Sequence, residues 1–224
     1  MKSLPFLFLA LLISCKSGPD EQKRITDVEK AFSKENKEET ISTESEDLAE
    51  KTMPSTKETI TFGTGCYWCS EAIFQQLDGV ESVTSGFMGG HIPNPTYEQV
   101  CTKTTGHVEV IHIVFNPSVI STKTLLMWFW KSHDPTDAGG QGADRGPQYA
   151  TSIFYHSDEQ KALAEKSMGT AQAVFDKPIA TKIRKAETFY KAKDEHQDFY
   201  FNNKNNRYCN AVINPKLEKL GLDQ

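Results

Sequence analysis

Hydrophobic and polar positions follow two clear periods in the chain from residue 58 onward. Alternating or β-branched apolar runs predict strands over residues 59–62, 80–86, 107–115 and 150–155. Helical spacing predicts helices over residues 68–77, 121–133 and 157–175. Between them lie a proline-containing turn at 91–95, a Gly-rich loop at 134–147 and a tail after Asn202 that is expected to be mostly loop. Strands that alternate with helices indicate one α/β (α+β) domain over residues 59–224.

The first 14 residues have the pattern of a signal peptide. Lys2 precedes an apolar run over residues 4–13, which is too short for a bilayer span because such a helix needs roughly 20 apolar residues. The run ends in Leu12-Ile13-Ser14-Cys15, which resembles the bacterial lipobox. The resemblance implies that residues 1–14 are a lipoprotein signal peptide and that Cys15 is the lipidation site. The alternative is an ordinary secretory signal with an unmodified Cys15.

Residues 15–58 are rich in charge and poor in large apolar side chains. Residues 19–58 hold twelve acidic and seven basic side chains, with Phe32 as their only aromatic. Such a segment buries too little apolar surface to offset its ordering entropy. We therefore expect a disordered acidic tether between lipid and domain, although a short helix around residues 25–32 fits the pattern. The formal net charge of -5 argues against nucleic acid as a partner, because phosphate binding requires a basic surface.

Cys66 is the first candidate for chemistry. It follows a predicted strand and a Gly-rich turn and opens a predicted helix, where backbone N–H groups and the helix dipole favour a thiolate. Cys69 completes a CxxC sequence, which is also typical of thioredoxin-like redox pairs and of half-sites for zinc. A structural zinc site would need a second closely spaced pair, whereas Cys101 and Cys209 are single and distant. We expect no bound metal.

A series of ordered motifs resembles the A-type peptide methionine sulfoxide reductases (MsrA). The motifs are Gly65-Cys66-Tyr67-Trp68, Gly89-Gly90, Asn94-Pro95-Thr96-Tyr97, Gly106-His107-Val108-Glu109-Val110, His133-Asp134-Pro135, Gln141 to Gly146, Gln148-Tyr149, Phe189-Tyr190 and His196-Gln197. The resemblance implies a two-layer sandwich with a ferredoxin-like mixed-sheet core. It also implies thiol-dependent reduction of methionine-S-sulfoxide, free or peptide-bound, with no bound cofactor.

The resemblance implies roles for individual residues. Cys66 is similar to the family nucleophile and Glu109 to its acid. Tyr97 and Tyr149 match the tyrosines that hydrogen-bond the sulfoxide oxygen, and Asp144 matches the residue that organises polar contacts there. Tyr67 and Trp68 match the aromatic wall around the substrate methyl group, although the family usually has Phe in place of Tyr67.

The chemistry of a sulfoxide requires the same set of groups. The sulfur is electrophilic but its oxygen leaves badly as an anion, so the reaction needs a thiolate at sulfur and an acid at oxygen. A carboxyl between aromatic rings can stay protonated near neutral pH. Without the motif, Glu109 would be one solvent-facing residue of an alternating strand, and Tyr97 and Tyr149 would be half-buried aromatics. His107, His133 and His196 are interpreted as structural.

The cysteine that resolves the Cys66 sulfenic acid has three candidates. Tyr208-Cys209 followed by Pro215-Lys216-Leu217 resembles the C-terminal resolving segment of many relatives, and we expect Cys209 to form the disulfide. Cys69 is the alternative resolving residue, because residues i and i+3 share a helix face. Cys101 is expected to be buried.

The predicted function is repair of oxidised methionine in cell-envelope proteins or as free methionine sulfoxide. The protein is expected to be a monomer that meets the membrane only through its lipid anchor, periplasm-facing or on the outer membrane. Its disulfide is expected to be reduced by an external thioredoxin-like partner, or by dithiothreitol in vitro. One rival is a CxxC thiol-disulfide oxidoreductase, which would turn over insulin disulfides. Another is a non-enzymatic peptide-binding lipoprotein, which would keep its function in Cys66→Ser.

Overall fold

The computed structural model describes residues 19–42 and 57–223. The predicted signal peptide and Cys15 lie outside these residues. In the described ranges, no helix is both long enough and apolar enough to cross a membrane.

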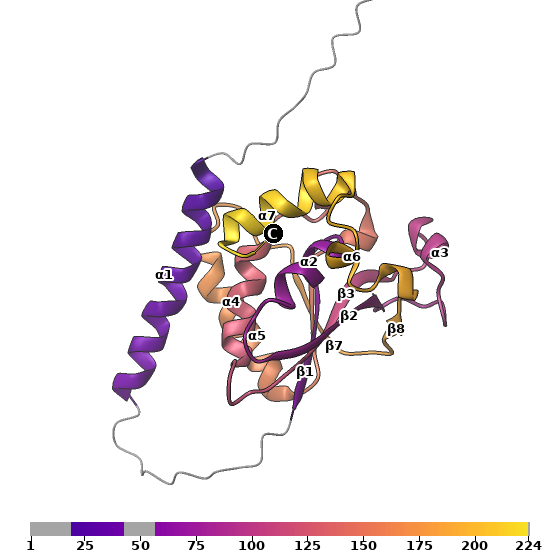
Figure 1. Ribbon diagram of the computed structural model, residues 1–224. Helices are drawn as coiled ribbons and strands as arrows, with labels where there is room; N and C mark the ends of the chain where they lie inside the picture. The colour runs from indigo at the N-terminus through magenta and orange to yellow at the C-terminus, as the bar shows by residue number, and fades with distance from the viewer. Residues whose placement is uncertain (1–18, 43–56, 224) are drawn as a thin grey trace, which may run out of the picture.

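A six-stranded sheet in the order β7-β6-β1-β3-β2-β8 forms the centre of the molecule (Figure 1). Its strands are β1 (Glu58–Gly63), β2 (Val80–Met88), β3 (Val108–Phe115), β6 (Ser152–Tyr155), β7 (Lys182–Lys185) and β8 (Tyr190–Lys191). The pairing of β6 with β7 is parallel and the other pairings are antiparallel. The unit β1-α2-β2-β3-α4-β6, with strand order β6-β1-β3-β2, is the ferredoxin-like arrangement, so the expected mixed-sheet core is confirmed.

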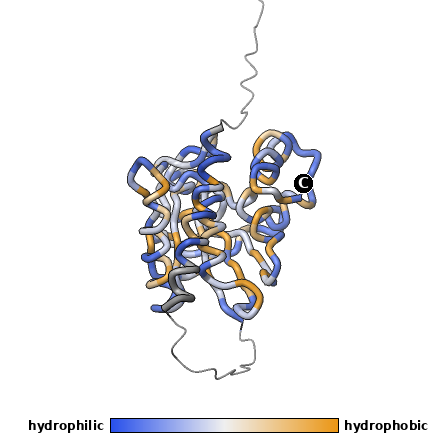
Figure 2. The backbone as a smooth tube through the Cα atoms, turned by 90° about the vertical axis from the view of Figure 1, so that its left-hand side faces the viewer, coloured by the Kyte–Doolittle hydropathy of each residue, from blue (hydrophilic) through white to orange (hydrophobic). Residues whose placement is uncertain are grey.

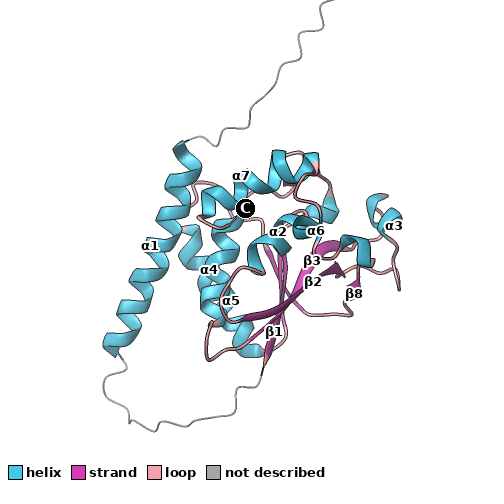
Figure 3. Ribbon diagram, viewed as in Figure 1, coloured by secondary structure: helices cyan, strands magenta, loops and turns pink. Residues whose placement is uncertain are grey.

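Helices surround this sheet, and α1 lies outside them against α4 and α5 (Figure 3). They are α1 (Pro19–Ser42), α2 (Tyr67–Phe74), α3 (Tyr97–Cys101), α4 (Thr122–Ser132), α5 (Asp158–Gln172), α6 (Phe199–Asn202) and α7 (Asn214–Leu220). Strand β3 alternates between two apolar clusters: Ile111 and Ile113 belong to the main core, and Val108 and Val110 belong to a second, smaller cluster. Period-two alternation therefore puts Glu109 on the same face as Ile111 and Ile113, which is buried and not open to solvent.

The expected disordered tether is wrong for residues 19–42, which form helix α1. Its side chains Ile25, Val28 and Phe32 are buried against α4 and α5. These positions recur at helical spacing, so they place one apolar stripe toward the domain. Figure 2 views the molecule from the side of α1 and shows that its N-terminal turns are hydrophilic.

Ion pairs flank the apolar stripe of α1. Glu21 accepts from Lys219 of α7 at 2.7 Å, and Glu29 accepts from the buried Lys131 of α4 at 2.6 Å. Glu35 lies 3.1 Å from Lys166 of α5. The acidic side chains that indicated a tether thus help to dock α1 on the domain, because they pair with lysines of the facing surface.

The expectation of a loop after Asn202 is also wrong in part. Residues Cys209–Ile213 form a π-helical turn that continues directly into α7. Ile213, Leu217 and Leu220 are buried, and this apolar burial orders the segment over α2 and α4. The Gly-rich loop contains a small hairpin of β4 (Gly140–Gln141) and β5 (Asp144–Arg145).

Candidate active site

Cys66 lies at the junction between β1 and α2. It is the N-cap of α2, with φ of -62° and ψ of 124°, and only 7% of its surface is exposed. Gly65 before it has φ of 98°, and a Cβ there would come within 2.7 Å of the Gln141 side chain, so this turn requires glycine. The N-cap position confirms that Cys66 opens the helix. Its side chain, however, accepts no capping hydrogen bond.

The first backbone amide of α2 is directed at Glu109 instead. Tyr67 N–H donates to Glu109 Oε2 at 3.1 Å, and Glu109 is 2% exposed. Burial raises the pKa of Glu109 to about 8. The hydrogen bond from the Tyr67 N–H lowers this pKa, whereas the charges of Asp144 and Cys69 raise it by smaller amounts. Glu109 is therefore mostly protonated at neutral pH and can donate a proton.

Cys66 and Cys69 lie three residues apart at the start of α2, and each affects the ionisation of the other. Burial raises the pKa of the Cys66 thiol. The interaction with Cys66 lowers the pKa of Cys69 to about 7 despite burial, and the charge of Lys216 lowers it further. The pair thus loses its first proton near neutral pH.

Two tyrosine hydroxyls lie within electrostatic reach of these groups. Tyr97 begins α3, where Thr96 and Gln99 form a capping box, and Tyr149 ends a 3₁₀ turn that starts at Pro147. Burial raises the pKa of both tyrosines, and the charges of Glu109 and Cys66 raise it further. Both phenols therefore remain protonated donors.

Aromatic rings from distant parts of the chain surround Trp68. The Phe199 ring stacks on the indole with centroids 3.7 Å apart and planes 10° apart, and His196 stacks at 5.5 Å. His196 Nδ1 also forms a 2.9 Å hydrogen bond with the Tyr67 hydroxyl. The hydroxyl that distinguishes Tyr67 from the family's usual Phe thus has a partner. The indole Nε1–H is buried and has no partner among the described residues.

Tyr208, from the C-terminal segment, also contacts this group of residues. Its hydroxyl donates to Asp144 Oδ2 at 2.7 Å and lies 3.7 Å from Cys69 Sγ. Its ring meets the Trp68 indole edge-on at 5.7 Å. The geometry therefore joins a thiol pair, a protonated carboxyl, two phenol donors and an aromatic wall, which is the set of groups that sulfoxide reduction requires.

Residues 58–223 match the family model described as peptide methionine sulfoxide reductase. The chain belongs to this family. It is 47% identical over 162 residues to the peptide methionine sulfoxide reductase MsrA of Saccharolobus solfataricus, covering 72% of this chain and 92% of that protein. An MsrA of Thermus thermophilus is 48% identical over 163 residues, covering 73% and 93%.

Solved structures of the family share the fold. Mxr1 of Saccharomyces cerevisiae in reduced form is similar with a TM-score of 0.66 at 30% identity, covering 73% of this chain and 96% of that one. Methionine sulfoxide reductase A of Corynebacterium diphtheriae is similar with a TM-score of 0.59 at 32% identity, covering 68% and 77%. The protein is an MsrA-type oxidoreductase that reduces methionine sulfoxide.

The remaining cysteines of this reductase occupy different environments. Cys66, Cys69, Cys101 and Cys209 are all free thiols. Cys209 is fully buried in its helical turn, and burial raises its pKa, with a further increase from the charge of Cys69. Cys101 is half-buried rather than fully buried as expected.

Sequence reasoning missed Phe199 and Tyr208 and assigned His196 only a structural role. The signal for His196 was the His196-Gln197 motif within the resemblance. Phe199 stands in a segment without clear periodicity, where nothing marked it, and Tyr208 was noted only as the neighbour of Cys209 in the resolving segment. In the described residues, no group of three or more His, Cys, Asp or Glu could hold a metal ion.

Proposed function

We propose that this reductase acts on the S epimer of methionine sulfoxide through Cys66 and Glu109. The thiolate of Cys66 attacks the sulfoxide sulfur, and Glu109 gives its proton to the oxygen. Tyr97 and Tyr149 donate hydrogen bonds to that oxygen, and such donors typically contribute roughly 3 kcal/mol each. The adduct then collapses as the oxygen, with that proton, is transferred to the Cys66 sulfur, which releases methionine and leaves Cys66 as a sulfenic acid.

The observation that carries this proposal is the environment of Glu109. The carboxyl is buried beside the nucleophile, accepts the Tyr67 N–H, and has a pKa raised by burial to about 8. Proton exchange between Cys66 and Cys69, which lie three residues apart in the first turn of α2, would bring the negative charge to Cys66 when substrate arrives. Trp68 and Tyr67 supply the wall for the methyl group, and a chiral arrangement of wall and oxygen donors admits one epimer.

We further propose that two thiols act in turn after this step. Cys69 attacks the Cys66 sulfenic acid, which forms a Cys66–Cys69 disulfide and releases water. Cys69 lies three residues after Cys66 in the first turn of α2, so the two side chains share one helix face, which supports Cys69 as the first partner. Cys209, the residue expected from the C-terminal resemblance, then attacks Cys69, which forms Cys69–Cys209 and frees Cys66 as a thiolate. The contact of the adjacent Tyr208 with Cys69 supports this second exchange.

An external dithiol must finally reduce the disulfide. A thioredoxin-like protein fits this chemistry in the cell, and dithiothreitol fits it in vitro. The reductase itself then needs no bound cofactor. We propose that it acts as a monomer.

The decisive experiment is a single turnover without reductant on each pure epimer, followed by mass spectrometry. With one equivalent of sulfoxide per enzyme, we expect one equivalent of methionine from the S epimer, and none from Cys66→Ser. Comparable single-turnover rates on the R epimer would refute the proposed selectivity. Turnover of insulin disulfides that does not require sulfoxide would favour a thiol-disulfide oxidoreductase instead.

We also propose that Cys15 is lipidated and that the substrates are oxidised proteins of the cell envelope. The support is the sequence Leu12-Ile13-Ser14-Cys15 after a short apolar run. Cys15→Ser should abolish lipid incorporation and release the protein from membranes. A Cys15→Ser protein that stays membrane-bound with an unprocessed mass would instead identify the apolar run as the anchor.

A further inference from the structure

Glu71 is a buried acid that the proposed chemistry does not use. It lies on α2 and is 1% exposed. Oε2 accepts the Phe199 N–H at 3.3 Å, whereas Oε1 has no partner among the described residues. Burial raises the pKa of Glu71 to about 7, although backbone N–H groups of Asp198 and Phe199 lower it. Burying a carboxyl is unfavourable, so the buried position of Glu71 against this backbone needs an explanation.

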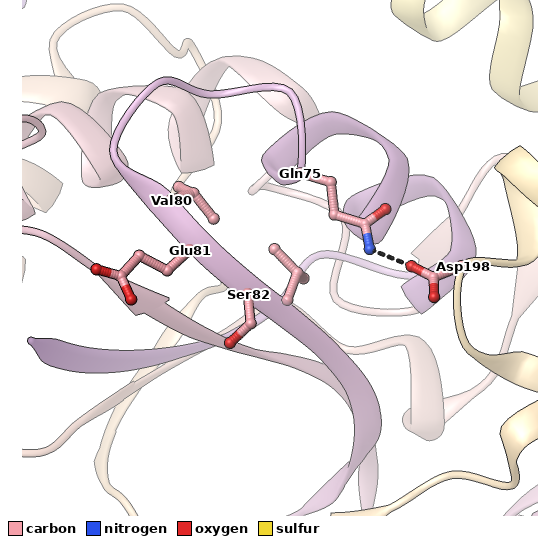
Figure 4. Close-up of a pocket in the computed structure, with 6 residues that line it drawn as sticks. Gln75, Val80, Glu81, Ser82 and Asp198 are labelled. Carbon is pink, nitrogen blue, oxygen red and sulfur yellow. Dashed lines mark hydrogen bonds between the residues drawn. The ribbon is translucent and has the colours of Figure 1, made fainter.

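Helix α2 holds the turn before α6 with two side chains. Gln75 Nε2 donates to Asp198 Oδ1 at 2.6 Å, beside a surface hollow of about 280 Å³ (Figure 4). Glu71 and Gln75 are at i and i+4 and so share one face of α2. Asp198 has a left-handed conformation with φ of 50°, which is uncommon outside glycine. The two contacts fix the backbone where this strained turn leads into Phe199.

The Phe199 ring in turn supports the catalytic wall. It stacks on the Trp68 indole at 3.7 Å, and Trp68 and Glu71 are at i and i+3 of the same helix. The contacts therefore form a closed circuit. Glu71 accepts a hydrogen bond from the Phe199 backbone, and the Phe199 ring stacks on the Trp68 indole, which precedes Glu71 on α2. The indole N–H has no partner among the described residues, so ring contacts are what orient its plane.

We propose that Glu71 is a positioning residue that sets the plane of the Trp68 indole by holding the backbone of Phe199. Through that plane it sets how strongly the site prefers a methyl sulfoxide over one with a larger alkyl group. Dispersion contacts weaken over fractions of an ångström, so a small displacement of Phe199 suffices to loosen the wall. This inference rests on the proposed role of Trp68 as the wall for the methyl group.

The test compares methionine sulfoxide with ethionine sulfoxide in single turnovers over a range of concentrations. We expect Glu71→Ala to lower the methyl-over-ethyl preference at least fivefold by weakening binding of the methyl substrate, with the maximal rate changed less than twofold. Glu71→Gln keeps a carbonyl acceptor and should restore the preference to within twofold of wild type. Phe199→Ala should match Glu71→Ala, and the double variant should lose no more than either. Glu81→Gln, which lines the same hollow, is the control and should have no effect.

Alkylation of Cys66 by iodoacetamide separates positioning from general damage. It should proceed at the wild-type rate in every variant. A wild-type preference in folded Glu71→Ala would overturn the inference. So would equal losses of maximal rate and alkylation rate in Glu71→Ala and Glu71→Gln.

Further variants keep the test decisive if Glu71→Ala does not fold. In that case, a wild-type preference in Phe199→Ala, together with a lost preference in Trp68→Ala, would overturn the inference while leaving the wall intact. An unchanged preference in Trp68→Ala would overturn the wall itself, and with it this inference, while the roles of Cys66 and Glu109 would stand.

Discussion

Replacing Glu109 with glutamine should slow the enzyme and stabilise its fold at the same time. Glutamine keeps the shape and the acceptor for the Tyr67 N–H but has no proton to transfer. We expect the single-turnover rate at pH 7 to fall by roughly 10²- to 10⁴-fold, the range typical of lost general acid catalysis. The wild-type rate should rise through about pH 7 as the Cys66–Cys69 pair ionises, and fall through about pH 8 as Glu109 ionises. The variant should lack the falling limb.

The effect on stability follows from the raised pKa of the same carboxyl. Burial raises the pKa of Glu109 from an ordinary value of 4.5 to about 8 in the folded protein. Its contribution to stability is therefore fully present below pH 4.5 and is lost as the pH rises through 8. At pH 7 the unfolded chain gains up to about 3 kcal/mol from ionising this group, since each pH unit above 4.5 contributes about 1.4 kcal/mol. Glu109→Gln should be more stable than wild type by up to that amount at pH 7 and no more stable at pH 4.

Urea unfolding between pH 4 and pH 8, followed by circular dichroism, measures this difference. Glu218→Gln removes one exposed carboxylate from α7 and controls for net charge. A Glu109→Gln rate within threefold of wild type would refute the role as acid. A stability difference that does not depend on pH would refute the buried, raised-pKa state of the carboxyl.

Three further predictions concern selectivity, the disulfide and the N-terminal helix. The S epimer of methionine sulfoxide should react at least a hundredfold faster than the R epimer in stopped-flow turnovers, and similar rates would contradict the chiral site. After one equivalent of sulfoxide, peptide mapping should find Cys66–Cys69 trapped in Cys209→Ser and Cys69–Cys209 in wild type; a Cys66–Cys209 linkage that forms at the wild-type rate in Cys69→Ser would make Cys209 the direct resolver. Phe32→Ala removes the largest buried side chain of α1, a change that typically costs about 3–5 kcal/mol in a core, so limited proteolysis should cleave α1 much faster while single-turnover rates stay within twofold. Unchanged protection of α1 would contradict its docking through Phe32.

The position of Cys66 could be predicted from the sequence because it depends on local geometry, whereas Glu109 was identified as the acid only through the resemblance to MsrA. Cys66 follows a strand and a glycine turn, and both the helix start and the N-cap position follow from that pattern. Glu109 stands on an alternating strand, where period two assigns it to the face of Ile111 and Ile113 once that face is known to be covered. The motif order then links these elements to a family, and the ferredoxin-like strand order agrees with it.

The second layer of the site could not be predicted in this way. His196, Phe199 and Tyr208 come from irregular segments far from Trp68 in the chain, and their positions depend on how the C-terminal segment buries Ile213 and Leu217. No local periodicity encodes such contacts. The same holds for Glu71, whose proposed positioning role follows only from its contact with the Phe199 backbone.

Helix α1 shows most clearly which features the sequence determines and which depend on the tertiary structure. The sequence by itself determined its helical stripe of Ile25, Val28 and Phe32 and its surplus of acidic side chains. Whether that stripe orders or stays solvated depends on a partner surface, because three apolar side chains alone do not offset the entropy of ordering a helix. Only the tertiary structure decided the outcome, since the folded domain presents buried apolar contacts together with lysines such as Lys131 and Lys219 opposite the acids of α1.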